Sequence, residues 1–397
     1  MSLDGLRRYQ RQGKNAYFDP IRAFLVEAKP EETVRQAFLQ RLLGEYGVPD
    51  SALAVEYMLT KGGSTSRRRA DIVVSGALGP LMVVECKEPG TPLHDGVFEQ
   101  ARVYADELGC SYIALTNGTR LDAFHRVADR WEGIAFPSFA MMHAPLRLKY
   151  REPPSREFSP LTSKQLNDLE FLTTHDRKLG QDWSYCVIGE DTPQELWTPI
   201  YSLYAAVFHR PQVTSALPYE KDGFRVEEYL GLHFLEYGNY SGGKFPGLYA
   251  SFRVKDVNND DQIYRVGFFS TMHTENHPTW GNRKGTSGIH VAIDDFDRTP
   301  HMSLELSLDT CLTQHRGRSD VVHDGKITVG RLGAAKRDRL IAFVAKDAPH
   351  LVRDSSVVLG SFPSGRPLAF ADVSQLVFNL LHYAEIRDRF RAEYRRS

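Results

Sequence analysis

The sequence has few cysteines, almost no net charge and no long apolar segment, and each shortage excludes a class of protein. Its four cysteines are far apart and form no CxxC pair, so neither a thiolate zinc site nor a dithiol redox centre is predicted. No apolar run approaches the roughly 20 residues that span a bilayer. The opening residues, MSLDGLRRYQRQ, lack an apolar stretch behind their charges, so no secretory signal is expected. We therefore expect a cytoplasmic protein with reduced thiols and no membrane contact.

The sequence also lacks the nucleotide-binding motif of ATP-driven motor proteins. The sequence contains no G-x-x-x-x-G-K-[ST] phosphate loop, which excludes an ATP-driven motor of the common type. The formal net charge of -1 does not advertise nucleic-acid binding, but local basic patches, rather than total charge, determine such binding.

Length and composition favour two domains. The 397 residues are 42% hydrophobic and 25% charged, as in ordinary globular proteins. The stretch YREPPSREFSP carries three prolines and four charges, which is typical of a linker. We predict a first domain at residues 1–148, a linker at 149–162 and a second domain at 163–397.

The first domain has the pattern of an α/β protein. Apolar periodicity and terminal signals predict one helix, three strands, a second helix and two further strands. Because a helix crosses between two buried strands, we expect a mixed sheet flanked by helices. The predicted elements, in order, are residues 30–43, 53–60, 70–77, 81–87, 97–109, 111–118 and 121–126.

The second domain has the pattern of an α+β protein. Residues 224–311 alternate and are rich in aromatics, which predicts an antiparallel sheet. Thr192 to Glu195 form a capping-box pattern that predicts a helix to about residue 209. Further helices are expected at 335–347 and from Asp372 into the basic C-terminal residues.

One short stretch, LMVVECKEPG at residues 81–90, combines a buried strand with chemistry. Glu85 and Lys87 are two residues apart on this strand and share a face, whereas Cys86 points to the packed side. Asp71 begins the preceding apolar strand, and a short turn between the strands would bring its carboxylate close to Glu85 and Lys87. Two clustered carboxylates repel each other unless a cation lies between them, and Mg2+ prefers oxygen ligands. A lysine there can position or activate a water molecule and offset charge on a phosphate.

These residues resemble a known family. Asp71, Glu85, Cys86 and Lys87 are similar to the motif of the PD-(D/E)XK nuclease superfamily, and residues 29–126 resemble the N-terminal nuclease domain of type I restriction enzyme R subunits. The resemblance is carried by PEETVRQAFL, RRRADIVV, LMVVECKEPG, EQARVYADELG and YIALTNG. The sequence differs from the superfamily motif at one position: Ala70 precedes Asp71, where the motif's name has proline. It implies a restriction-endonuclease-like fold, with Asp71, Glu85 and the Cys86 carbonyl binding Mg2+, for which Mn2+ can substitute, and with Lys87 acting on the nucleophilic water.

The resemblance also implies supporting residues. Superfamily nucleases often place a glutamate of the first helix near the metal, and both Glu31 and Glu32 qualify. We prefer Glu31, because the apolar residues that follow it at i+3, i+7 and i+11 put it on the inward face; the alternative is that both only favour the helix start. Gln100 and Tyr104 match a Gln-x-x-x-Tyr element beside the active site of related nucleases. Without the resemblance, Tyr104 would be assigned to core packing.

Three consecutive arginines lie just before Asp71, with Ala70 between. Arg67, Arg68 and Arg69 are candidates for DNA phosphate contacts, which position the nucleic acid without specifying its sequence. The alternative is a solvated charged face.

The functional expectation is therefore a Mg2+-dependent endonuclease that hydrolyses DNA phosphodiester bonds in restriction or phage defence, with RNA left open as a substrate. The second domain would control recognition or activation, and a homodimer or a protein or nucleotide activator would be a partner. The alternative is a catalytically silent nucleic-acid-binding or scaffold subunit of a restriction-type complex.

Overall fold

The computed structural model divides the chain into two compact units, Met1–Pro153 and Pro154–Ser397, and each is described by itself. Most of the predicted linker at 149–162 lies outside the described residues and stays a prediction, as do the domain limits. The structure describes residues 5–61, 64–143, 158, 160–183, 185–238, 244–256, 258–294, 301–329 and 332–396.

The N-terminal unit contains a six-stranded mixed sheet, in the order β4-β5-β6-β7-β8-β9. Its only parallel pair among the described strands is β6–β7, which is joined by the crossing helix α2, as expected for a parallel connection. A small antiparallel sheet, β1-β2-β3, precedes it. The elements are β1 (Tyr9–Arg11), β2 (Lys14–Asp19), β3 (Phe24–Glu27), α1 (Pro30–Gly44), β4 (Leu53–Lys61), β5 (Ser64–Gly76), β6 (Gly79–Cys86), α2 (Asp95–Leu108), β7 (Tyr112–Thr116), β8 (Leu121–Val127), β9 (Arg130–Ile134) and α3 (Phe139–His143).

The two faces of this sheet bury different residues. Ile72 and Val84 pack with Phe38 and other residues of α1 in one core. Val73 and Val83, one residue away in each strand, pack with α2 in a second core. Strand alternation thus explains why both strands are apolar throughout: each residue is buried against one helix or the other.

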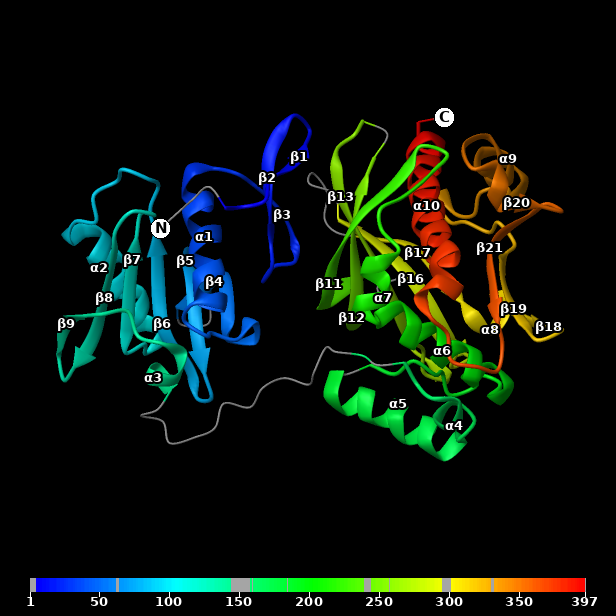
Figure 1. Cartoon of the computed structure of the whole chain (residues 1–397), viewed down its shortest axis with the longest axis horizontal. Helices are drawn as coiled ribbons and strands as arrows, with labels where there is room; N and C mark the ends of the chain where they lie inside the picture. The colour runs from blue at the N-terminus through cyan, green and yellow to red at the C-terminus, as the bar shows by residue number, and fades with distance from the viewer. Residues whose placement is uncertain are drawn as a thin grey trace. The chain divides into compact units, whose positions relative to one another are not determined.

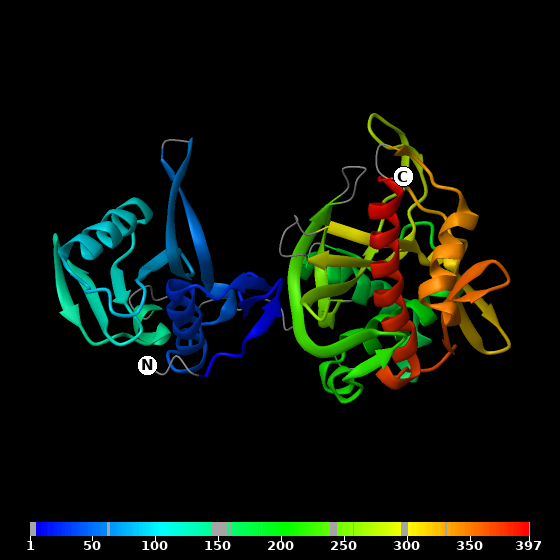
Figure 2. The ribbon, with the colours of Figure 1, turned by 90° about the horizontal axis from the view of Figure 1, so that it is seen from above.

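The mixed sheet with flanking helices is confirmed, and the structure corrects some details. Strand β5 begins at Ser64 rather than at Ala70, so Asp71 lies within the strand and not at its start. The predicted end of α2 at Gly109 is confirmed: this residue has a φ of 71°, in the left-handed region that glycine adopts without strain. The small sheet β1-β2-β3, strand β9 and helix α3 were not predicted. Figure 2 shows β4 and β5 as a long two-stranded ribbon.

The described part of the C-terminal unit contains three antiparallel sheets, and the long helix α10 lies between the two main ones (Figure 1). The larger of these has the order β10-β11-β12-β13-β16-β17, and the smaller β18-β19-β21-β20; the third is the two-stranded sheet β14-β15. The elements are α4 (Ser163–Leu166), α5 (Leu169–Trp183), α6 (Trp197–Phe208), α7 (Arg210–Ser215), β10 (Tyr219–Lys221), β11 (Phe224–Gly238), β12 (Lys244–Lys255), β13 (Asp261–Ser270), β14 (Thr274–His277), β15 (Gly281–Arg283), β16 (Ser287–Asp294), β17 (His301–Ser307), α8 (Leu308–Cys311), β18 (Leu312–His315), β19 (Arg318–His323), α9 (Arg337–Asp347), β20 (Val352–Arg353), β21 (Ser356–Pro363) and α10 (Phe370–Tyr394).

The separate antiparallel sheet of this unit is confirmed, whereas the capping role of Thr192 is wrong. The Thr192 hydroxyl contacts Ser287 at 2.8 Å and Asp309 at 3.1 Å, so a tertiary contact takes the oxygen that a cap would use. The helix begins at Trp197. Helices α4 and α5 and the smaller sheet were not predicted.

No helix in the described part of the chain is both long enough and apolar enough to cross a lipid bilayer. The cytoplasmic location stays a prediction.

Candidate functional site

Asp71 and Glu85 are neighbours on adjacent strands. Strands β5 and β6 are antiparallel with Ile72 opposite Val84, so the next residue outward in each strand, Asp71 and Glu85 respectively, falls on the same face. Both are buried, at 8% and 3% exposure. The Oδ2 atom of Asp71 accepts a 2.7 Å hydrogen bond from the backbone N–H of Cys86. The short hairpin therefore produces the predicted pair of carboxylates.

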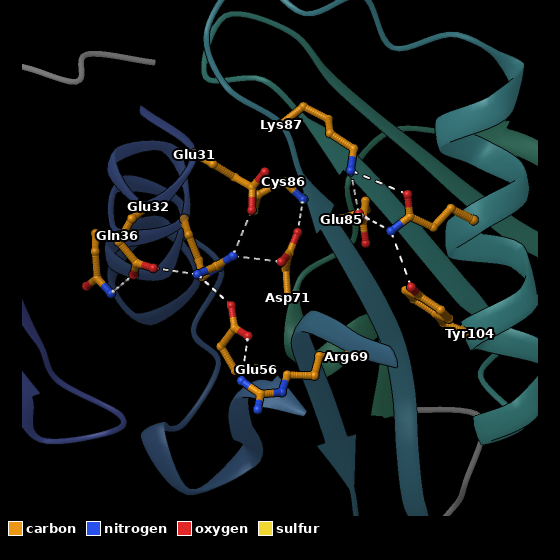
Figure 3. Close-up of polar contacts among 12 residues, drawn as sticks. Glu31, Glu32, Gln36, Glu56, Arg69, Asp71, Glu85, Cys86, Lys87 and Tyr104 are labelled. Carbon is orange, nitrogen blue, oxygen red and sulfur yellow. Dashed lines mark hydrogen bonds and ion pairs between the residues drawn. The ribbon is translucent and has the colours of Figure 1, made fainter. Parts of the chain in front are cut away.

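Glu85 connects this pair to Lys87 and to helix α2. Its Oε1 atom accepts hydrogen bonds from Lys87 Nζ and Gln100 Nε2, each at 2.7 Å. Gln100 lies one helical turn before Tyr104, whose hydroxyl is 3.3 Å from Gln100 Nε2. Figure 3 shows Lys87 and Tyr104 on the α2 side of the cluster. The structure thus brings together Asp71, Glu85, Lys87, Gln100 and Tyr104, and Cys86 is fully buried on the opposite face, as predicted.

Helix α1 contributes a buried arginine that pairs with carboxylates from three elements. The side chain of Arg35 is 6% exposed, and its guanidinium lies 2.7 Å from Asp71, 2.8 Å from Glu56 and 3.1 Å from Glu31. It also pairs with Glu32. The four carboxylates, which Figure 3 labels, thus pair with one guanidinium, so the acid cluster is held together by an internal cation.

The two glutamates at the start of α1 have different surroundings. Glu32 accepts from Arg22 Nη2 at 2.9 Å and from Gln36 Nε2 at 2.8 Å, besides pairing with Arg35. Glu31 pairs with Arg35 alone among the described residues, and its side chain is 46% exposed. The expectation that Glu31 is on the more buried face is therefore wrong: the neighbouring small sheet, which was not predicted, covers Glu32 instead through Arg22. Glu31 is still the glutamate whose carboxylate is open to further ligands.

Burial and crowding of like charges shift the protonation of the site. Burial, and then repulsion from Asp71, raise the pKa of Glu85 to about 7. Burial also raises the pKa of Asp71 against the opposing effect of Arg35. Burial lowers the pKa of Lys87, but its hydrogen bond to Glu85 reverses this and raises it overall. Lys87 is therefore an ammonium at neutral pH, and it lies beside a carboxyl whose pKa is raised by burial and by Asp71.

The raised pKa of Glu85 predicts a pH-dependent stability. Below its unfolded-state value near 4.5 the carboxyl is neutral in both states and costs nothing. Between about 4.5 and 7 the unfolded chain ionises this carboxyl while the folded state keeps it protonated, so stability falls across that window and levels off at higher pH. Glu85→Gln should therefore exceed wild type in unfolding free energy by about 1–3 kcal/mol near pH 8, with the gain vanishing near pH 4. Urea denaturation across pH measures this, and the exposed neighbour variant Glu88→Gln should follow wild type. Parallel profiles for Glu85→Gln and wild type would refute the assignment.

The three arginines of β5 differ in their contacts. Arg68 pairs with Glu107 at 2.9 Å, and Arg69 pairs with Glu56 at 3.5 Å. Their side chains are 40% and 55% exposed, so both remain accessible. The side chain of Arg67 lies outside the described part of the chain. Contact of these arginines with DNA stays a prediction.

The donor set fits a hard cation with a few protein ligands. The Oε2 atom of Glu85 is buried and has no hydrogen-bond partner among the described atoms, so an acceptor is left over where a cation would be favourable. A carboxylate oxygen that accepts one hydrogen bond retains a further lone pair, so the contacts of Asp71 do not exhaust it. Among the described residues, no group of three or more His, Cys, Asp or Glu side chains is arranged for a metal ion. Mg2+ commonly takes one or two carboxylate ligands from the protein and completes its shell with water and phosphate. Asp71 and Glu85 can supply those carboxylates.

Two residues of the site were missed by the sequence reasoning. Arg35 follows Glu31 by four positions and Glu32 by three, which is the spacing of ion pairs on a helix. This spacing alone indicates that Arg35 pairs with both glutamates. Glu56 lies opposite Asp71, because β4 and β5 pair Val55 with Ile72 on one side of it and Tyr57 with Ala70 on the other. A lone glutamate within an apolar strand was the signal for it. Glu56 also has a φ of 52°.

Comparison with known proteins places part of the N-terminal unit. Residues 30–136 match the family described as type I restriction enzyme R protein N terminus (HSDR_N). A search of curated proteins gives no match. One solved structure, a fragment assigned to an HsdR subunit of a type I restriction enzyme from Vibrio vulnificus YJ016, is 25% identical, with a TM-score of 0.25. That match covers 29% of this chain and 25% of the other. Because the TM-score is below 0.5, the match carries no argument about the fold. Residues 30–136 are thus a region similar to the N terminus of type I restriction enzyme R proteins.

Proposed function

We propose that the N-terminal unit is a Mg2+-dependent endonuclease that hydrolyses DNA phosphodiester bonds. The observation that carries the proposal is the unpartnered, buried Oε2 atom of Glu85, which lies on the same face as Asp71 and beside the Lys87 ammonium. Buried carboxylates with raised pKa values and a specific cationic partner are more frequent at active sites than elsewhere. The similarity of residues 30–136 to restriction R proteins supports the same reaction class.

The residues would divide the work as follows. Asp71, Glu85 and the Cys86 carbonyl would hold the metal, with Glu31 contributing from α1. Bound there, Mg2+ would polarise the phosphate and lower the pKa of a water ligand. The Lys87 ammonium, fixed by Glu85, would orient the attacking water and offset charge developing on the phosphate oxygens.

Gln100 would fix the orientation of the Glu85 and Lys87 side chains, because it contacts both. Its Nε2 donates to Glu85 at 2.7 Å, and its Oε1 is 3.4 Å from Lys87 Nζ. Tyr104 would in turn orient Gln100. Arg68 and Arg69 would contact phosphates along the strand.

A second candidate, a catalytically silent subunit that binds nucleic acid, is favoured by one observation. Arg35 already neutralises Asp71, and a site balanced by its own arginine has less need of a metal. We place it second because the Arg35 contact leaves lone pairs on Asp71 and leaves Glu85 Oε2 without a partner.

Metal-dependent cleavage tests the proposal. We expect the full-length protein to cut plasmid DNA with Mg2+ or Mn2+, and excess EDTA to abolish cutting. Asp71→Asn should lower the rate at least about 100-fold, because it removes the charge that attracts the metal while preserving side-chain size. Matched RNA substrates identify the preferred nucleic acid. If the wild-type protein binds DNA yet cuts none with either metal, the silent-subunit function replaces this proposal.

Restriction or phage defence would be the setting, and a second copy of the chain would supply the site for the opposite DNA strand. The C-terminal unit would govern recognition or activation.

A further inference from the structure

A pocket of about 530 Å3 opens in the C-terminal unit. It is bounded by strand β17, the segment after β19, the start of α9 and the C-terminal half of α10. Among these elements, helix α10 contacts both β17 and α9 (Figure 1). The volume is within the range of small-molecule sites, roughly 300–1,000 Å3.

The pocket is lined by an excess of positive charge. Five of its described lining residues are Arg or Lys, and Glu305 is the acidic one. Lys326 pairs with Asp324 at 2.8 Å and Arg391 with Asp388 at 3.1 Å. The other three, Arg283, Arg337 and Arg387, have no carboxylate partner among the described residues. Guanidiniums that share a pocket repel one another unless an anion lies between them.

Arg387 is the most informative of the three because it is buried. It is only 6% exposed, and its Nε atom has no hydrogen-bond partner among the described atoms. Its Nη1 donates to the Lys326 carbonyl at 3.1 Å, and the guanidinium lies 5.4 Å from the centre of the Tyr383 ring. These contacts hold the side chain in place without neutralising it. A buried, uncompensated cation costs several kcal/mol, so the pocket is built at a cost that a bound anion would offset.

The nearby histidine adds no positive charge. Burial, and then the Arg387 guanidinium, lower the pKa of His323 to about 4. His323 is neutral at pH 7 and accepts from Gly325 N at 3.2 Å.

A second pocket of about 330 Å3 adjoins the first, because Arg283 lines both. Phe245, Met272 and Trp280 line it, so it is largely apolar and aromatic. Trp280 is 41% exposed, and the ring of His277 stacks on it with centroids 4.3 Å apart. An exposed aromatic ring beside a cationic pocket offers a surface on which a planar base can stack.

We propose that the paired pockets bind a nucleotide, with its phosphates against Arg283, Arg337 and Arg387 and its base in the aromatic pocket beside Trp280. Guanidiniums suit this role because their planar fork binds phosphate oxygens through two hydrogen bonds. Arg283, at the junction, would contact the phosphate nearest the sugar. Nothing in this assignment depends on the acid cluster of the N-terminal unit.

Calorimetric titration of the full-length protein with the four ribonucleoside triphosphates tests the proposal, with pyrophosphate and duplex DNA as further ligands. We expect at least one triphosphate to bind and Arg283→Ala to weaken it about tenfold or more, the usual loss for a charge-assisted hydrogen bond. Trp280→Ala should weaken the triphosphate but not pyrophosphate. Arg283 and Trp280 are exposed, so neither variant threatens the fold.

Arg353→Ala is the matched control, since Arg353 is an exposed arginine of β20 that lines neither pocket. Lys87→Ala should bind the triphosphate as wild type does, which separates this proposal from the proposed nuclease. Failure of all four triphosphates to bind, equal binding of pyrophosphate and triphosphate, or binding of duplex DNA alone would each overturn the nucleotide site.

Discussion

Lys87→Ala should lower the rate of Mg2+-dependent DNA cleavage by about 10²- to 10⁴-fold, the range for loss of a group that handles protons or charge in the transition state. The fold should survive, because Glu85, deprived of its ammonium partner, can take up a proton near neutral pH: its pKa is already raised to about 7 by burial and by Asp71. Single-turnover cleavage of a plasmid measures the rate, and circular dichroism checks the fold.

The control is Lys14→Ala in the same unit. Lys14 is 59% exposed and pairs with Glu27 at 3.2 Å, so its loss removes an equal charge away from the acid cluster. A folded Lys87→Ala protein that cuts at the wild-type rate would contradict the role of Lys87, whereas equal losses in both variants would point to a general effect of charge on DNA binding.

Arg35→Met should destabilise the protein by about 3–5 kcal/mol, because breaking a buried ion pair from one side leaves uncompensated buried charge. Asp71 and Glu32 would then be left without their shared guanidinium. Urea denaturation near pH 7 measures the loss. Acidification should shrink it, because protonated carboxyls no longer need a counter-ion; the raised pKa of Asp71 starts this recovery at a higher pH than an ordinary aspartate would show.

Arg102→Met is the matched comparison. Arg102 forms ion pairs with Glu99 and Asp106, each at 2.8 Å, but its side chain is 38% exposed, so we expect a loss of about 1 kcal/mol or less. If Arg35→Met also loses only about 1 kcal/mol or less of unfolding free energy, water screens the repulsion among the carboxylates sufficiently, and Arg35 is not their counter-ion.

The parts of the site that local rules govern were accessible from the sequence. Strand periodicity puts Glu85 and Lys87 on one face, and a short hairpin fixes the register that brings Asp71 beside them. Helical spacing likewise joins Gln100 to Tyr104. These are short-range relations, so they follow from the order of residues without knowledge of the remaining fold.

What the sequence did not predict depends on contacts between distant segments. Arg35 became part of the site because α1 lies against β4 and β5, and Glu32 became buried because Arg22, next to the small sheet, reaches it. The basic pocket joins Arg283, Arg337 and Arg387, which are separated by 54 and 50 positions. Helical periodicity treats Arg387 as a charged helix residue and gives no sign that it is buried.

Glu56 is in a left-handed backbone conformation within strand β4, opposite Asp71. Such a conformation costs a non-glycine residue about 1–2 kcal/mol, and glycine or asparagine would adopt it more readily. The residue is therefore locally frustrated: its main chain prefers a different amino acid, while its carboxylate bridges the guanidiniums of Arg35 and Arg69. Conflicts of this kind between local backbone preference and tertiary contacts are concentrated where a protein binds or reacts. Strand β4 is therefore part of the acid cluster, to which it contributes the carboxylate of Glu56.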